Sequence, residues 1–563
     1  MEQGGTLKSE NDKGTIITNH DKDKASSNTV TIDANGKNDK VEVTLKDVNI
    51  DASRGSEAAV SVTGKGDTTI ELDGDNELKS GAGHAGLEHN KTDTSGELTI
   101  QDKDNNGSLE AAGGFKGAGI GSAGSNDAQV KITGGNITAT TSDDWGAGIG
   151  SGSYGTGTVE ITGGEINATG GYLGAGIGGG CNGSGNVTIS GGTITAAGSD
   201  GAAGIGGGYY NGATVTITGD AVIKNASSTK YGAGIGGGNG SDGNVTISGN
   251  AKIENATGGY GAAGIGGGAF SSPDKIGNGN VVIKDNAKID NVQGGAYGAG
   301  IGGGIYGLSN VTIEGNTKVN ATGGAGGAAI GGGAGAENNS DNNGNQITIK
   351  SNENGSPTIN AVGGGTDEGE KIVIGGAGIG AGCESDADAD ITLEGKVTIT
   401  ATAGKDNVAI GANGIEQEFS GLAEGGSITR YDPEGNDITL PTDPVPAVPS
   451  SSGGGSADAS VQESVFPGLV VTDKDGQRIS YTSIRGNNVL SLRVGRFTAS
   501  LRASLATLRQ LRAEGIDTIT FQTILCSTTL SVDELLAMGG EDTEVVLTHH
   551  IRSSTLTVGG KAV

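Results

Sequence analysis

The sequence is poor in the large apolar and aromatic residues that fill a compact core. Aromatic residues make up 3% and hydrophobic residues 33% of its 563 positions. A single globular core in a chain of this length needs more large apolar side chains, so one compact domain is excluded. No stretch approaches the ~18 consecutive apolar residues of a membrane-spanning helix, so we expect no membrane insertion.

Cysteine, proline and net positive charge are also lacking. Three cysteines give no disulfide framework, and eight prolines without a Gly-X-Y repeat exclude collagen. The formal net charge of -29 disfavours nucleic acids and anionic membranes as partners. The opening MEQGGTLKSE is not a signal peptide. We expect an extracellular or cell-surface monomer whose signal peptide lies outside this sequence.

Glycine is abundant, with 113 residues, and much of it lies in one repeated motif, Gly-Ala-Gly-Ile-Gly and its variants. Neighbouring motifs are 28 to 49 residues apart, most often 28 to 31, which is the sequence signature of a solenoid. The motif isoleucines are Ile120, Ile149, Ile177, Ile205, Ile235, Ile265, Ile301, Ile330, Ile379 and Ile410.

Each repeat also contains two further short strands. An x-Val-x-Ile strand such as Val187–Ile189 is followed by a turn, then by a strand with one inward aliphatic residue, such as Ile194. Three strands and three turns per ~29 residues predict one coil of a parallel β-helix, whose coils stack ~4.8 Å apart. We therefore predict an all-β fold, a right-handed parallel β-helix of about 12 coils. Its narrow core needs few large apolar residues.

The domain boundaries follow from composition. Residues 1–27 are predicted to be a flexible or capping segment, 28–430 the β-helix, 431–460 a Pro/Gly/Ser linker and 461–563 a small α+β domain of unknown function. In that last domain the pattern predicts helices over 496–515 and 531–540, and strands over 517–525 and 543–551.

The repeats resemble known families. The GAGIGGG…VTISGGTITA pattern resembles the glycine-rich β-helix regions of large surface proteins from Gram-positive bacteria. VEVTLKDVNIDASRGSEAAVSVTGKGDTTIELDGDNEL, from residue 41, resembles a carbohydrate-binding domain family typified by a calcium- and polygalacturonate-binding β-helix protein of clostridia. The resemblance implies a secreted or wall-attached protein that binds acidic plant polysaccharide.

Aromatic residues flank the third strand of six adjacent coils. One row lies four or five residues before the motif isoleucine and the other lies four or five residues after it. Rings lining a flat Gly/Ala floor are expected to stack on the apolar faces of sugars. The alternative is a ladder of rings that stiffens the loops. The candidates are Trp145, Tyr154, Tyr172, Tyr209, Tyr210, Tyr231, Tyr260, Phe270, Tyr297 and Tyr306.

Calcium is the one candidate cofactor. Asp102, Asp104 and Asn106 alternate before a glycine, as in the front half of a calcium loop. Asp386, Asp388 and Asp390 fall on one side of an extended segment. The alternative for both segments is a solvated turn.

Catalysis is not expected. Pectate-lyase-like enzymes with a β-helix fold use a basic residue, typically arginine, next to a calcium cluster. Arg54 is the one arginine between residues 28 and 429, and it lies outside the regular repeats. The sequence therefore favours a non-catalytic carbohydrate-binding surface protein that recognises a plant or host glycan. The alternatives are an adhesin or spacer rod and, less favoured, a polysaccharide lyase.

Overall fold

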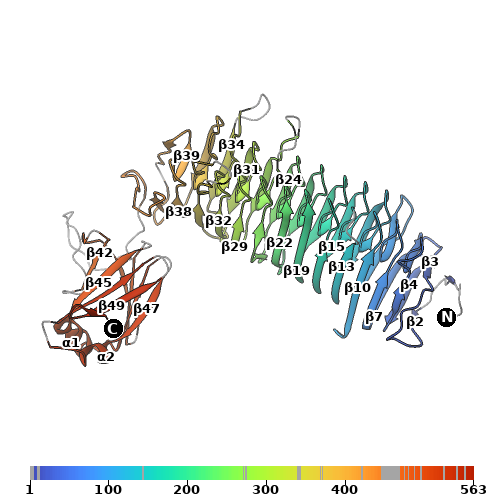
Figure 1. Cartoon of the computed structure of the whole chain (residues 1–563), viewed down its shortest axis with the longest axis horizontal. Coiled ribbons are helices and arrows are strands. Elements are labelled where there is room, and N and C mark those ends of the chain that lie inside the picture. The colour runs from blue at the N-terminus through green and yellow to red at the C-terminus, as the bar shows by residue number, and fades with distance from the viewer. Residues whose placement is uncertain are drawn as a thin grey trace. The chain divides into compact units, whose positions relative to one another are not determined.

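The computed structural model divides the chain into two units, residues 1–448 and 449–563 (Figure 1). It describes residues 6–8, 13–141, 145–269, 272, 275–338, 344–367, 369, 372–419, 422–444, 469–474, 476–479, 481–486, 488–494, 498–523, 526–540, 543–550 and 553–562.

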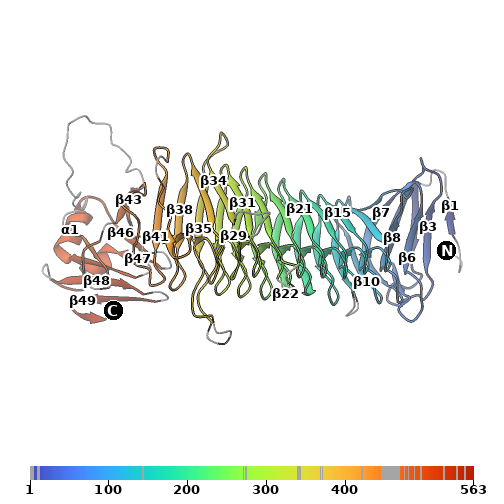
Figure 2. The same ribbon diagram turned by 90° about the horizontal axis from the view of Figure 1, so that it is seen from above.

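The first unit is a right-handed parallel β-helix of about 15 turns, so the predicted fold class is confirmed. Its coils stack in chain order, and three parallel sheets run along it (Figures 1 and 2). Sheet A contains β1 Thr6–Lys8, β3 Val30–Ala34, β6 Val60–Gly64, β8 Leu87–Lys91, β11 Ile120–Gly121, β14 Ile149–Gly150, β17 Ile177–Gly178, β20 Ile205–Gly206, β23 Ile235–Gly236, β27 Ile265–Gly266, β30 Ile301–Gly302, β33 Ile330–Gly331, β36 Ile379–Gly380 and β39 Ile410–Ala412, with β40 Ile415–Glu416 antiparallel at its end.

Sheets B and C carry the longer strands. Sheet B contains β2 Lys13–Thr18, β4 Lys40–Lys46, the first part of β7 Asp67–Lys79, β9 Leu98–Gln101, β12 Asp127–Ile132, β15 Gly157–Ile161, β18 Gly185–Ile189, β21 Ala213–Ile217, β24 Gly243–Ile247, β28 Gly279–Ile283, β31 Ser309–Glu314, β34 Asn345–Lys350 and β37 Ala389–Glu394. Sheet C contains β5 Asn49–Asp51, the end of β7, β10 Gly107–Gly113, β13 Asn136–Thr141, β16 Glu165–Thr169, β19 Thr193–Asp200, β22 Val222–Lys230, β25 Lys252–Ile253, β26 Ala256–Thr257, β29 Lys288–Gln293, β32 Lys318–Thr322, β35 Thr358–Val362, β38 Thr398–Thr402 and β41 Ser427–Tyr431.

The core is a file of stacked aliphatic side chains. In sheet A the motif isoleucines pair in register from coil to coil, and each is fully buried. Sheet B adds two aliphatic residues per coil, such as Val187 and Ile189, and sheet C adds Ile194 and Ala196. Stacking identical side chains gives each coil close-packed neighbours above and below without a large core.

The predicted start of the solenoid and its number of coils need correction. The segment 1–27 is not wholly outside the β-helix, because β1 pairs with β3 and β2 pairs with β4. These strands lack the glycine motif that marks the later coils. The β-helix therefore begins before residue 28, and it has about 15 turns instead of 12.

A buried ion-pair cluster closes the C-terminal end of the solenoid. The Arg430 side chain is fully buried and donates to both carboxylate oxygens of Asp443, at 2.7 and 2.9 Å. It also donates to the carbonyl of Ile410 and pairs with Glu416. Glu416 in turn accepts the backbone N–H groups of Ala409 and Ile410. Side chains thus satisfy backbone groups that a further coil would otherwise pair.

The second unit is a small α+β domain, as predicted, and its described residues form two sheets and two helices. One sheet contains β42 Val470–Thr472, β45 Ala499–Ser504, β48 Glu544–His549, β49 Ser554–Val558 and β50 Lys561–Ala562; the other contains β43 Thr482–Gly486, β44 Val489–Arg493, β46 Thr518–Gln522 and β47 Ser527–Ser531. The helices are α1 Leu505–Ala513 and α2 Val532–Leu536.

The predicted helix over 496–515 is too long at its start. Residues 499–504 form β45, and the Ser504 side chain accepts a hydrogen bond from the Thr507 backbone, so it is the N-cap of α1. Leu501 therefore points inward with the period of a strand, whereas Leu508 follows that of a helix. The strand within 517–525, the strand within 543–551 and the Ser531-capped helix are confirmed.

A candidate sugar-binding seam along the solenoid

The glycine motif folds the chain into a narrow inward loop. The glycine after each motif isoleucine has φ between +131° and +148°, a region open in practice to glycine alone. A Cβ at Gly236 would lie 2.0 Å from the carbonyl oxygen of Gly266 in the next coil. Within one motif, the N–H of Ala233 donates to the carbonyl of Gly237 at 2.9 Å, which closes the loop. The motif is therefore buried backbone that carries one inward isoleucine.

The two aromatic rows lie side by side because the corners that carry them are hydrogen-bonded together. The backbone N–H of the residue four positions after a motif isoleucine donates to a carbonyl in the preceding coil. That carbonyl belongs to the residue four positions before the isoleucine of that coil. The N–H of Cys181 donates to Trp145 at 2.7 Å, and that of Ala269 to Tyr231 at 2.8 Å. The expected flat Gly/Ala floor is wrong, since Ala147 and its counterparts in other motifs are fully buried beneath this line. We call the line of joined corners the seam.

Several rings on the seam face solvent. Tyr154, Tyr172, Tyr260 and Tyr306 are 40% to 57% exposed. Trp145, Tyr209, Tyr210, Tyr231 and Tyr297 are partly buried. Phe270 lies outside the described residues. Phe115, 41% exposed, was missed by the sequence reasoning, although it lies five residues before Ile120 and so in the position of Tyr172.

Neighbouring rings contact one another along the entering side of the seam. Tyr260 makes edge-to-face contacts with Tyr231 and Tyr297, at centroid distances of 6.1 and 5.7 Å. Phe115 and Trp145 are 5.8 Å apart. These are the distances at which ring pairs attract. The predicted ladder of rings is thus present here, while the outer faces of several rings remain accessible.

Five of the tyrosines have an unusual backbone conformation. Tyr154, Tyr210, Tyr231, Tyr297 and Tyr306 have φ between +61° and +71°. Bulky residues rarely adopt this left-handed region, which costs roughly 1–2 kcal/mol for a non-glycine residue. Other coils place glycine at the same corners, for example Gly201, Gly240, Gly261, Gly326 and Gly335. The fold accepts glycine there, so a tyrosine is retained at the expense of backbone strain.

Three lysines stand next to seam rings in this otherwise acidic protein. The Lys116 ammonium lies 5.1 Å from the Phe115 ring and 5.2 Å from the Trp145 ring. Lys275 lies 4.0 Å from the ring of Tyr210. Such pairs present a positive charge beside an apolar face.

The third of these lysines, Lys230, lies 4.8 Å from the ring of Tyr231. The Asp200 carboxylate, 3.5 Å away, raises the pKa of Lys230 and so keeps it protonated. Lys230 therefore carries a fixed positive charge and is poorly suited to act as a base.

Tyr209 and Tyr210 form a local cluster at the middle of the seam. Their hydroxyls are hydrogen-bonded at 2.7 Å, and their ring centroids are 3.8 Å apart. Burial, followed by the contact with Tyr210, raises the pKa of Tyr209 to about 12. The Tyr209 hydroxyl therefore stays protonated at neutral pH and donates its proton to the Tyr210 oxygen.

The structure does not assemble the predicted calcium ligands. Among the described residues, no three His, Cys, Asp or Glu side chains converge as a metal site. Asp102 accepts the backbone N–H groups of Asn106 and Gly107, so it holds a turn, while Asp104 and Asn106 are exposed. The second predicted set, Asp386, Asp388 and Asp390, alternates along the chain as expected, and all three residues are exposed. Residues two apart in an extended chain lie ~6.6 Å apart, which leaves these carboxylates separated.

The C-terminal end of the seam is covered by another segment. Asp367 and Ile372 pair with each other, and Ile372 packs with Ala334 and Cys383. Tyr297 and Ile374 pack against the same cluster. A Cβ at Gly326 would lie 3.2 Å from Ile372, so this side chain sits over the corner that follows Tyr297. The exposed aromatic seam therefore ends at the coil of Ile301.

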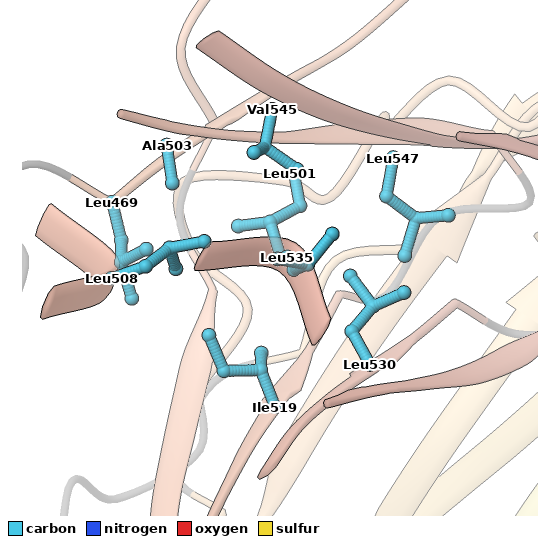
Figure 3. Close-up of a pocket in the computed structure, with 9 residues that line it drawn as sticks. All are labelled: Leu469, Leu501, Ala503, Leu508, Ile519, Leu530, Leu535, Val545 and Leu547. Atoms are coloured by element: carbon cyan, nitrogen blue, oxygen red, sulfur yellow. The ribbon is translucent and has the colours of Figure 1, made fainter. Parts of the chain in front are cut away.

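The pocket of the second unit is part of its core. Nine apolar side chains line it, including Leu501, Leu508 and Leu547 (Figure 3). None of the described residues that line it has a polar side chain to orient a ligand, so it is a packing gap and not a binding site.

Comparison with known proteins supports the repeat architecture alone. The beta helix repeat family matches residues 130–153, 159–181, 187–209 and 245–269. The chain matches no curated protein and no solved structure. Within the described part of the chain, no helix is both long and apolar enough to cross a membrane.

Proposed function

We propose that this chain is a non-catalytic extracellular protein of a Gram-positive bacterium that binds an acidic polysaccharide along the seam. The observation that carries the proposal is the set of tyrosines at positive φ. Glycine fits these corners without strain, while Lys116, Leu173 and Glu384 adopt positive φ at equivalent corners of other coils. The strain is therefore not particular to tyrosine, but contact of the exposed ring with a ligand would offset it. Tyr154 and Tyr306 are 57% and 43% exposed, so packing of these rings contributes little stability, and contact with a ligand explains them better.

The positive charges beside the seam rings support an acidic ligand, although the chain as a whole is negatively charged. The chain carries a net charge of -29 and repels polyanions at long range. The ammonium groups of Lys116 and Lys275 nevertheless lie beside seam rings, where they can pair with sugar carboxylates while the rings contact the apolar sugar faces. Lys230 also lies beside a ring, but its charge is already paired with Asp200. This combination agrees with the resemblance to the polygalacturonate-binding family of clostridia.

Calcium remains a separate proposal. The described carboxylates do not form a closed site, but a polyuronate supplies carboxylates of its own. A calcium ion shared between Asp386 or Asp388 and such a ligand would be held partly by the ligand. Binding measured with calcium and with a chelator tests this independently of the seam.

A polysaccharide retention assay with the variant Tyr172→Ala/Tyr231→Ala tests the main proposal. Losing two ring contacts of about 0.5–1.5 kcal/mol each weakens binding by roughly tenfold. Tyr172→Phe/Tyr231→Phe keeps both rings and should retain binding. Ile16→Ala, which removes an exposed apolar side chain at the N-terminal end, is the matched control. A folded Tyr172→Ala/Tyr231→Ala protein with unchanged retention would refute the proposal.

The second candidate function is an adhesin or spacer rod, favoured by the ring contacts among Tyr231, Tyr260 and Tyr297. In that case the rings stiffen the solenoid, and the alanine variant loses stability but no glycan binding. A polysaccharide lyase is the least favoured, and release of unsaturated oligosaccharides from polygalacturonate would establish it.

A further inference from the structure

We infer that the seam binds one extended glycan chain parallel to the solenoid axis, with contacts in each of seven consecutive coils. The inference rests on the proposed function and adds the form of the ligand. It predicts recognition of an internal stretch of a long linear chain, not of a chain end or a single sugar.

The first argument is continuity. Every coil from that of Ile120 to that of Ile301 places at least one aromatic ring on the seam. The residues, in coil order, are Phe115; Trp145 and Tyr154; Tyr172; Tyr209 and Tyr210; Tyr231; Tyr260; and Tyr297 and Tyr306. The coil of Ile205 lacks a ring on its entering corner, where Gly201 stands, and the Tyr209 ring covers that glycine. Each of the seven coils therefore contributes at least one ring to the strip.

The second argument is repeat length. The seven coils span six steps of ~4.8 Å, or ~29 Å. The repeat of an extended pyranose chain is close to one coil, so a chain lying along the axis offers a ring face to each successive coil. A chain lying across the axis reaches only two joined corners, which belong to neighbouring coils, and leaves the other rings unused.

The third argument is that the strip is bounded. Ile372 covers the corner at Gly326, and the coil of Ile330 has no aromatic residue at its corners, which are occupied by Ala325, Gly326, Ala334 and Gly335. At the other end, the coil of Leu87 has no aromatic residue in GAGHAGLEHN. The contact length is therefore finite, and additional sugars beyond it gain nothing.

The fourth argument is the position of the lysines along the strip. Lys116 lies at its first coil, Lys275 lies next to Tyr210 and Lys230 lies next to Tyr231. Charges near the end and the middle of the strip favour a ligand with carboxylates repeated along its length over one with a single charged terminus.

Calorimetric titration of the full chain with size-fractionated oligogalacturonates tests the inference. Affinity is expected to rise with each added sugar up to about seven residues, one per coil, and then to level off. The monomer and dimer should bind at least 100-fold more weakly than the heptamer. Neutral β-1,4-linked glucose oligomers of the same lengths measure the contribution of the carboxylates.

Variants at the two ends of the strip locate the chain. Phe115→Ala and Tyr306→Ala should each weaken heptamer binding several-fold and leave trimer binding nearly unchanged, because a trimer can occupy the middle coils. Ile16→Ala should affect neither.

Equal affinity for dimer and heptamer would overturn the inference and leave a local sugar site within the proposed function. Affinity that keeps rising well beyond seven sugars would also overturn it, since the chain would then use a longer face. Failure of a folded protein to retain polygalacturonate of any length would overturn the proposed function itself, and the inference with it.

Discussion

The strain attributed to the seam tyrosines can be measured by replacing one of them with glycine and with alanine. Tyr154 has φ +67°, and both replacements remove its ring. Alanine keeps the left-handed cost of roughly 1–2 kcal/mol, whereas glycine does not have it. Glycine loses about 0.5–1 kcal/mol more conformational entropy on folding. Tyr154→Gly should therefore be more stable than Tyr154→Ala by about 0.5–1 kcal/mol.

Tyr172 provides the matched comparison. It also stands at a seam corner, is 49% exposed and does not have a positive φ. Only the entropy term applies to it, so Tyr172→Ala should be more stable than Tyr172→Gly by about 0.5–1 kcal/mol. The difference between the Gly-versus-Ala stability gaps at Tyr154 and Tyr172 no longer contains the effect of the lost rings or of the conformational entropy of glycine. It should equal the backbone strain alone, roughly 1–2 kcal/mol.

Urea unfolding followed by the fluorescence of Trp145 suits this measurement. Trp145 is the one tryptophan of the chain and belongs to the same coil as Tyr154. Hydrogen exchange of the seam amides reports local opening, which a repeat protein can undergo without complete unfolding. If alanine and glycine rank in the same order at both positions, the tyrosines are not strained and the main support for the proposed function disappears.

Three further predictions concern the solenoid itself. Gly236→Ala should prevent its coil from closing, which circular dichroism and proteolysis would reveal, while Gly365→Ala, with no atom within 4 Å of the new Cβ and no positive φ, should fold. Arg430→Met should destabilise the C-terminal cap by about 3–5 kcal/mol, because it leaves buried carboxylates unpaired, and amides near the last coil should exchange faster. Burial raises the pKa of Cys181 and Cys383 from 9.0 to about 11, so both should resist Ellman's reagent in the native protein at pH 8. The unfolded thiols ionise first, so the stability that these two residues contribute is complete below pH 9 and is lost as the pH rises through about 11.

Most of the fold could be predicted because the glycine motif and the strand pattern recur at a regular spacing in the sequence. The spacing of the motif isoleucines and the alternation in strands such as Val187–Ile189 specify three strands per coil, and each of these residues is buried as expected. The first strands, β1 and β2, were missed because they pair with later coils without carrying the glycine motif. In the second unit, Leu501 fits both helical and strand spacing, and only its pairing partners decide between them.

The candidate site was predicted in position but not in shape. The sequence places Tyr231 before the motif of Ile235 and Ala269 after the next motif, but it does not show that a backbone hydrogen bond joins these corners. The cap at Arg430 was missed, although arginine is absent between Arg54 and that residue. The acidic side chains were the least predictable, because spacing alone does not tell whether a carboxylate such as that of Asp102 holds a turn or a metal.

The glycine that follows each motif isoleucine has a consequence for how such a protein can diverge. A side chain at this position meets the carbonyl of the next coil in every motif from Gly121 to Gly380, so single changes there are poorly tolerated. Inserting or deleting a whole coil creates no new kind of contact, since each coil already stacks on an equivalent one. We therefore expect relatives to differ in the number of coils more than in the motif. If the seam binds a glycan, each coil gained or lost within the aromatic strip would change the length of chain it recognises by one step.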